Sequence, residues 1–195
     1  MKNFHNNKGV TLTEVIMAAL LLTVVFLAVS ALFVTSQTFH FTSNDKVAIG
    51  YELQYAIGHI YKNVMSGIGD KGNPAIAITD DLEFVVRHIE ETDPENSPTY
   101  SDYTDDEEIT YTITGDGKLS YVNSVTLEED TDMIPRVTLL TTNDPVSGER
   151  FSKFELDGGV LRIKLTAESL LIRGDNEKER LTIYSACYPR LASFQ

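Results

Sequence analysis

The first part of the chain is dominated by a long apolar run without charge. Between residues 15 and 34 the only polar side chains are those of Thr23 and Ser30. About twenty apolar residues in a helix match the roughly 30 Å hydrocarbon core of a bilayer. We therefore predict an apolar transmembrane helix in residues 10–36.

Helical periodicity continues beyond this apolar run. Apolar residues recur three and four positions apart, and no proline precedes Pro74. This spacing places the apolar side chains on one helix face, which predicts an amphipathic continuation over residues 37–66 with that face packed on a sheet. The residues concerned are Ile49, Leu53, Ile57, Ile60 and Val64.

From residue 67 onward the apolar pattern takes the two-residue period of strands. Ile109, Tyr111 and Ile113 alternate with threonines, and residues 161–166 alternate in the same way. The glycines of Asp157-Gly158-Gly159 predict a tight hairpin. Other strands are expected in residues 82–89, 137–140 and 181–187. The predicted fold class is α+β: a long N-terminal helix packed on an antiparallel β-rich head, residues 67–195, with acidic loops.

Charge and side-chain chemistry exclude several functions. The net charge is −13, and the region from Asp80 to Asp132 holds seventeen Asp and Glu residues against two basic residues. Such a head repels phosphate backbones, so we expect no nucleic-acid binding through it. The single cysteine, Cys187, permits no intrachain disulfide and is expected to be a buried apolar residue.

Candidate catalytic chemistry is weak throughout. The four histidines lack metal-ligand spacing, and neither a phosphate-binding glycine loop nor a nucleophile elbow occurs. We therefore expect no enzyme activity, no cofactor and no metal. The acidic run Asp102 to Glu108 is interpreted as a solvated loop, with calcium binding left open. The tripeptide Arg173-Gly174-Asp175 is interpreted as a loop tip.

The residues that flank the apolar run indicate its orientation. Lys2 and Lys8 precede it and no acid occurs before Glu14, so the short N-terminus is expected in the cytoplasm and the head outside. Two simple interpretations are a plain anchor and a secretory signal peptide cleaved near Ala28-Val29-Ser30. Neither explains Glu14, a carboxylate at the edge of an apolar span, where an unpaired charge is costly.

The segment Lys8-Gly9-Val10-Thr11-Leu12-Thr13-Glu14-Val15 resembles the class III signal of type IV prepilins and type II secretion pseudopilins. The resemblance implies that residues 1–9 are a basic leader, that a prepilin peptidase cleaves after Gly9, and that the new N-terminus, Val10, is methylated. It also implies that Glu14 pairs with the N-terminal amine of a neighbouring subunit and sets the assembly register. Val10 stands where Phe is usual, and Thr13 where Ile or Val is common.

The resemblance also implies a function and partners. The chain is expected to be a structural subunit of a type IV pilus, a secretion pseudopilus or a competence (DNA-uptake) filament. A minor subunit is favoured over the major one. The chain is also expected to turn at Gly115-Asp116-Gly117. The spacing of this hairpin and the one at Asp157-Gly158-Gly159, with a late strand closing on Tyr188-Pro189-Arg190, is similar to that of W-type minor pilins and J-type minor pseudopilins. Expected partners are other pilin subunits, the prepilin peptidase, the inner-membrane assembly platform and the lipid bilayer. The alternatives are a membrane-anchored extracellular binding or adhesion module and a secreted enzyme released at Ser30.

Overall fold

The computed structural model describes residues 10–69, 72–88, 106–170, 178–189 and 191–192. The chain divides into two compact units, with the division between Asn44 and Asp45. Helix α1 (Leu12–Ser66) contributes to both units, and the strands belong to the second. The fold class predicted from the sequence is confirmed, because one long N-terminal helix packs on antiparallel β-sheets.

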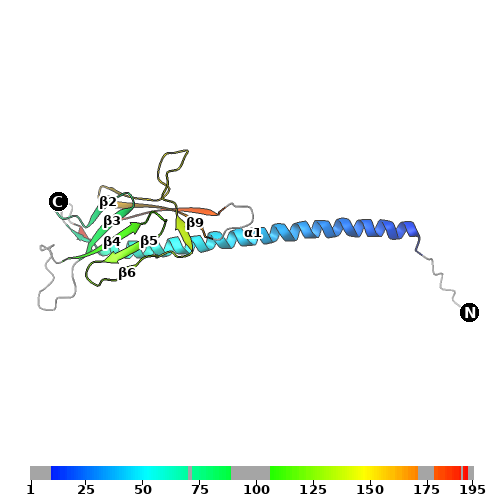
Figure 1. Ribbon diagram of the computed structural model, residues 1–195, viewed down its shortest axis with the longest axis horizontal. Helices are drawn as coiled ribbons and strands as arrows, with labels where there is room; N and C mark the ends of the chain where they lie inside the picture. Colours follow the sequence, from blue (N-terminus) through cyan, green and yellow to red (C-terminus); the bar gives the residue numbers. More distant parts are fainter. Residues whose placement is uncertain (1–9, 70–71, 89–105, 171–177, 190, 193–195) are drawn as a thin grey trace, which may run out of the picture. The chain divides into compact units, whose positions relative to one another are not determined.

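The first sheet has its strands in sequence order. It contains β2 (Ile76–Asp80), β3 (Glu83–His88), β4 (Glu107–Ile113), β5 (Leu119–Asn123) and β6 (Glu129–Asp130), and all its neighbours are antiparallel. Figure 1 shows these strands beside the C-terminal part of α1. The predicted strand over residues 82–89 is thus confirmed as β3, and Tyr111 faces the core as its alternation indicated.

The second sheet is built around β9 (Val160–Ser169). Strand β10 (Arg180–Cys187) pairs with one side of β9, whereas β7 (Val137–Leu139) and β8 (Lys153–Asp157) pair with the other side. Gly158 and Gly159 join β8 to β9 with φ of 59° and 80°. Positive φ at both central residues is the geometry of a type I′ turn, so the predicted hairpin is confirmed.

A third pairing was not expected from the sequence. Strand β1 (Ile68–Gly69) follows α1 directly and pairs in parallel with β11 (Leu191–Ala192) near the C-terminus. At Gly69 an added Cβ would lie 2.2 Å from the backbone nitrogen of Ala75. This close approach of two backbone segments requires glycine.

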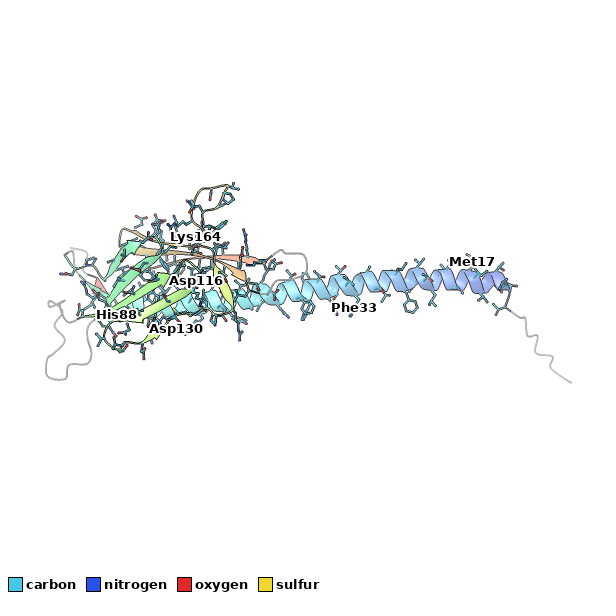
Figure 2. All side chains as sticks on the ribbon, viewed as in Figure 1. Met17, Phe33, His88, Asp116, Asp130 and Lys164 are labelled. Atoms are coloured by element: carbon cyan, nitrogen blue, oxygen red, sulfur yellow. The ribbon has the colours of Figure 1, made fainter. Side chains whose placement is uncertain are left out.

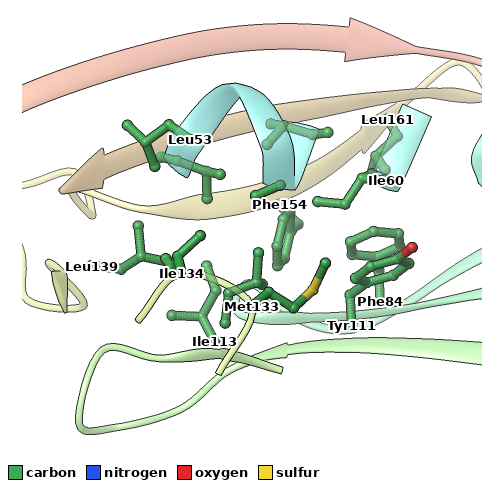
Figure 3. Packing of buried hydrophobic residues seen from close by; sticks show 14 of the residues in the cluster. Leu53, Ile60, Phe84, Tyr111, Ile113, Met133, Ile134, Leu139, Phe154 and Leu161 are labelled. Carbon is green, nitrogen blue, oxygen red and sulfur yellow. The ribbon is translucent and has the colours of Figure 1, made fainter. Parts of the chain in front are cut away.

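Helix α1 and the two larger sheets enclose one core. The predicted apolar face of α1 is confirmed, since Ile49, Leu53, Ile60 and Val64 are buried and Ile57 is partly buried. Figure 3 shows the aromatic rings of Phe84, Tyr111 and Phe154 packed in this core. The ring of Phe84 is stacked on Tyr111 at 5.0 Å and meets Phe154 edge-on at 4.6 Å between centroids.

Two details of the second sheet bear on the predictions. Cys187 is buried as expected, and this burial raises the pKa of its thiol to about 11. The predicted alternation along β9 is wrong at Thr166, which is buried instead of facing outward. The reason is that residues 151–152 cover it: its N–H donates to Oγ of Ser152 at 3.0 Å, and its hydroxyl donates to the carbonyl of Phe151 at 2.7 Å.

Candidate functional site in the N-terminal part of α1

The N-terminal part of α1 presents apolar side chains without cover from the rest of the described chain. Every residue from 10 to 41 is exposed, and Figure 2 shows Met17 and Phe33 projecting from the helix. A helix that is apolar on all sides lies in lipid or in a protein interior. By length and composition α1 can cross a membrane, so this segment needs a lipid or protein environment.

Three threonine hydroxyls in this part of α1 are satisfied inside the helix. The hydroxyls of Thr23, Thr35 and Thr38 donate to the carbonyls four residues earlier, at 2.8, 2.9 and 3.0 Å. In hydrocarbon an unpaired hydroxyl is costly, and this local bond removes the cost. These threonines are therefore compatible with a lipid or protein interior.

The helix begins with a capping box formed by Thr11 and Glu14. Oε2 of Glu14 accepts hydrogen bonds from the backbone N–H of Thr11 at 2.8 Å and from its hydroxyl at 2.9 Å. In return, the backbone N–H of Glu14 donates to Oγ1 of Thr11 at 3.3 Å. Thr at the N-cap and Glu three residues later satisfy two of the helix's free amides reciprocally. Both bonds to the carboxylate end on Oε2, so Oε1 takes part in neither.

The expected processing site lies next to this cap. Gly9 and the remainder of the leader lie outside the described residues. Val10 is described, precedes the helix and is 72% exposed. Glu14 is the only charged residue between positions 10 and 44. A carboxylate at the start of an apolar helix, four residues after the expected new N-terminus, is the chemical feature of this site.

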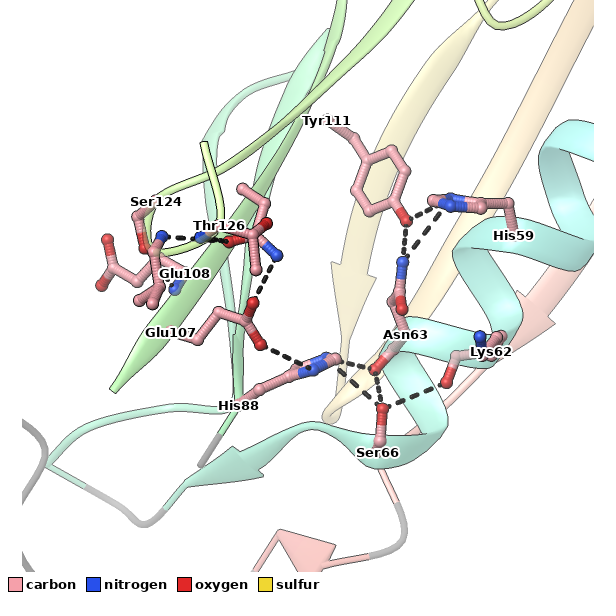
Figure 4. Close-up of polar contacts among 12 residues, drawn as sticks. His59, Lys62, Asn63, Ser66, His88, Glu107, Glu108, Tyr111, Ser124 and Thr126 are labelled. Atoms are coloured by element: carbon pink, nitrogen blue, oxygen red, sulfur yellow. Dashed lines mark hydrogen bonds and ion pairs between the residues drawn. The ribbon is translucent and has the colours of Figure 1, made fainter. Parts of the chain in front are cut away.

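A second polar cluster joins α1 to the first sheet (Figure 4). The hydroxyl of Tyr111 lies 2.8 Å from Nδ1 of His59 and accepts a bond from Nδ2 of Asn63 at 2.5 Å. The Tyr111 oxygen can accept from both neighbours, so the tautomer of the His59 ring decides which of the two groups donates in the bond between them. His59 thus lies in the interface between the helix and the sheet.

His88 extends this cluster to the end of the helix. Its Nε2 lies 2.7 Å from the carbonyl oxygen of Asn63, which can only accept, so His88 donates. Its Nδ1 is 3.9 Å from Oε2 of Glu107, and the other oxygen of Glu107 accepts from the Asn123 amide. A donor on a carbonyl of the last helical turn is stabilising there. The role of the cluster is thus to hold α1 on the sheet.

The expected acidic loop is partly a strand. Residues 102–105 and the tripeptide Arg173-Gly174-Asp175 lie outside the described residues. At the described end, Glu107 and Glu108 belong to β4, and Asp106 is 3.9 Å from Nε of Arg87. The loop interpretation is therefore wrong for these two glutamates, because β4 extends through them to pair with β3. Within the described ranges, no group of three or more His, Cys, Asp or Glu residues is placed to hold a metal ion.

Sequence reasoning anticipated Glu14 as a site residue but missed its bond to Thr11. The signal was present, since a threonine followed three residues later by glutamate and then an apolar run is typical of a helix start. Comparison with known proteins adds no relative: no protein-family model, no curated protein and no solved structure matches the chain.

Proposed function

We propose that this chain is a structural subunit of a type IV pilus or of a related filament for secretion or DNA uptake. A prepilin peptidase removes the leader after Gly9, and Val10 becomes a methylated N-terminus. The head lies outside the cytoplasmic membrane until the assembly platform moves the subunit into the filament. In this function the chain acts through packing, and it uses no catalytic residue, cofactor or metal.

The observation that carries this proposal is the position of Glu14. It is the single charge in residues 10–44, a part of the chain in which every apolar side chain is exposed. Cleavage after Gly9 creates a positive amine four residues before it. In a low-dielectric filament core, such an amine needs a carboxylate partner, and Glu14 of a neighbouring subunit supplies one. In a plain membrane anchor Glu14 would serve only as the cap of its own helix.

The second unit suits display on such a filament. It has its own core, from Ile49 of the helix to Cys187 of β10, and carries most of the acidic residues. Its long acidic region would crowd a surface on which the same head is tightly repeated, because like charges repel. This favours a minor subunit over the major one.

The alternative, a membrane-anchored binding module, is favoured by one feature of the head. A groove of about 620 Å³ lies over the outer face of β8, β9 and β10, a volume in the range of ligand sites. Lys153, Arg162 and Lys164 line it together with Tyr184. These cations are paired with carboxylates of the same chain, so the groove has little net charge.

Shearing of intact cells separates the two functions. A filament subunit is released into the sheared fraction, and its release depends on the assembly ATPase of the host. A membrane-anchored module stays with the membrane pellet whether or not that ATPase is present. Recovery in the pellet alone contradicts the proposed function.

A further inference from the structure

Strand β10 is the outermost strand on one side of the second sheet. It pairs with β9 along its whole length without a register shift. The N–H of Ser169 donates to the carbonyl of Glu179 at 3.2 Å, and the bonded pairs of an antiparallel ladder recur at every second residue. The residues between these bonded positions therefore direct their N–H and C=O groups away from β9. We call these residues the β10 edge: Arg180, Thr182, Tyr184 and Ala186.

The β10 edge has no partner strand among the described residues. Proteins protect such edges against pairing with other chains by shortness, charge, proline or a bulge. The other outer strands that the structure describes have this protection. Strands β1, β6 and β11 have two residues each and β7 has three, β8 carries three charges, and β2 has a register shift between Ile78 and Asp80.

Strand β10 lacks these devices after its first residue. Residues 181–187 contain neither a charge nor a proline, and their pairing with β9 is continuous. Tyr184, in the middle of the β10 edge, is 73% exposed. A long, uncharged, regular edge strand is a template for one more strand, so this edge has the properties of a strand-addition site.

The two faces beside β10 determine which side chains an added strand must carry. On the core face, Leu181 and Ile183 are partly buried against the core. A Cβ placed on Gly50 of α1 would lie 3.7 Å from Cδ2 of Leu181, so this face of β10 lies on the helix. On the outer face, Thr182 and Tyr184 are exposed. Because side chains on one face of neighbouring strands are in contact, the added strand needs apolar residues on the core face and polar residues between them.

Net charge restricts the added strand further. The whole chain has a net charge of −13, so an acidic strand and a second copy of this chain are both repelled. The cations near the β10 edge are already neutralised: Arg180 lies 2.6 Å from Glu168, and Lys164 lies 3.4 Å from Glu149. They therefore provide no excess positive charge that would attract an acidic segment.

We propose that the β10 edge binds an extended segment of another protein, which adds a strand to the second sheet. The segment is apolar at every second position and basic in net charge. Main-chain hydrogen bonds to the β10 edge supply affinity, and the alternating side chains supply selectivity. This inference does not depend on the proposed function, because a filament subunit and a membrane-anchored module would both present this edge.

Peptide selection on the full chain in detergent tests the proposal. A displayed library of random peptides of about ten residues is selected for binding to the wild-type chain. The selected peptides are expected to be apolar at every second position, to carry net positive charge, and to bind at least about tenfold more tightly than peptides of the same composition with a scrambled order. Selected peptides without this alternation, or no selected peptide, would overturn the inference.

Two neighbouring proline substitutions locate the binding edge. Thr182→Pro removes an N–H that points away from β9, so the ladder is kept and the selected peptide is expected to bind at least about tenfold more weakly. Ile183→Pro removes an N–H bonded to β9, so Tm is expected to fall further than in Thr182→Pro. Wild-type affinity of Thr182→Pro for the peptide would overturn the inference.

Amide hydrogen exchange of the wild-type chain makes the test independent of how the variants fold. The selected peptide is expected to slow exchange at Thr182, Tyr184 and Ala186 at least about tenfold. Little change is expected at Leu181 and Ile183, whose amides already bond to β9. Protection elsewhere in the chain would overturn the inference. A dimer of the wild-type chain in light scattering that Thr182→Pro abolishes would also overturn it, because the occupant would then be a second copy.

Discussion

Oε2 of Glu14 accepts hydrogen bonds from both the N–H and the hydroxyl of Thr11, at 2.8 and 2.9 Å. Glu14 therefore caps its own helix within one chain. The proposed function gives it a second role, as the charge partner of a neighbour's N-terminal amine. The cap needs only an acceptor oxygen, whereas the second role needs a negative charge, so substitutions can separate the two.

We predict that Glu14→Gln and Glu14→Ala enter the membrane and are cleaved as wild type but are poorly incorporated into filaments. Removing a charge eases insertion, and the bond after Gly9 is unchanged. In the filament, each neighbour's amine is left unpaired at a cost of about 3–5 kcal/mol. The measurement is the ratio of sheared to membrane-bound protein on immunoblots.

Thr11→Val is the matched control, because it removes the capping hydroxyl and leaves the charge. If the charge sets assembly, Gln at position 14 is as defective as Ala, and Thr11→Val assembles normally. If Glu14→Gln assembles like wild type while Thr11→Val fails, the essential role of Glu14 is the cap, and the charge-register mechanism is wrong.

The hydroxyl of Tyr111 links the sheet to α1, and its removal should lower stability. We predict that Tyr111→Phe reduces the free energy of unfolding by about 1–3 kcal/mol, since the Asn63 amide and the His59 ring lose a buried partner. Ring stacking on Phe84 is retained in this variant. Tyr121→Phe is the control, because the Tyr121 hydroxyl bonds to Glu128 in an exposed position. If urea unfolding shows that Tyr111→Phe and Tyr121→Phe lose equal free energy of unfolding, the stabilising role given to the Tyr111 hydroxyl is contradicted.

His59 should make stability depend on pH. Burial lowers the pKa of His59, the charge of Lys62 lowers it further, and Asp130 opposes this in part. The folded state thus disfavours protonation. Stability from the neutral ring is present above the unfolded-state pKa of about 6.5 and is lost as pH falls below it.

We therefore expect the urea midpoint of the full chain to fall between about pH 8 and about pH 5.5, and to fall less in His59→Leu. His88 is unchanged in this variant, so the difference between the two profiles belongs to His59. Parallel profiles for the wild type and the variant would contradict the role given to this histidine.

The head unit should fold without the apolar part of α1. The two compact units meet between Asn44 and Asp45, and the core residues of the helix begin at Ile49. A fragment of residues 45–195 therefore keeps the whole core and loses the exposed apolar segment. We expect it to be soluble and to melt cooperatively by circular dichroism. A fragment that aggregates or shows no cooperative transition would contradict this division.

Much of this fold could be predicted because the deciding interactions are local. The period-two pattern through Tyr111 located β4, and the two glycines after Asp157 located the β8–β9 turn. Strand β2 was missed because Ile76-Ala77-Ile78 is too short a pattern to be distinguished from a loop. The burial of Thr166 was missed because its cover comes from Phe151 and Ser152, which are distant in sequence.

The candidate site shows the same limit. Position and charge made Glu14 a candidate, because a carboxylate beside an apolar run is unusual. The bond between His59 and Tyr111 could not be predicted, because it joins a helix and a strand 52 residues apart.

The proposed function depends on processing of this chain as a prepilin, which the intact mass of the protein extracted from its native membrane reveals. In a host with an active prepilin peptidase we expect one mature species that begins at Val10 and carries a methylated N-terminal amine. In a host without that peptidase we expect the unprocessed chain. A mature chain that begins at Ala31, or an uncleaved chain in both hosts, would show that the chain is not a prepilin.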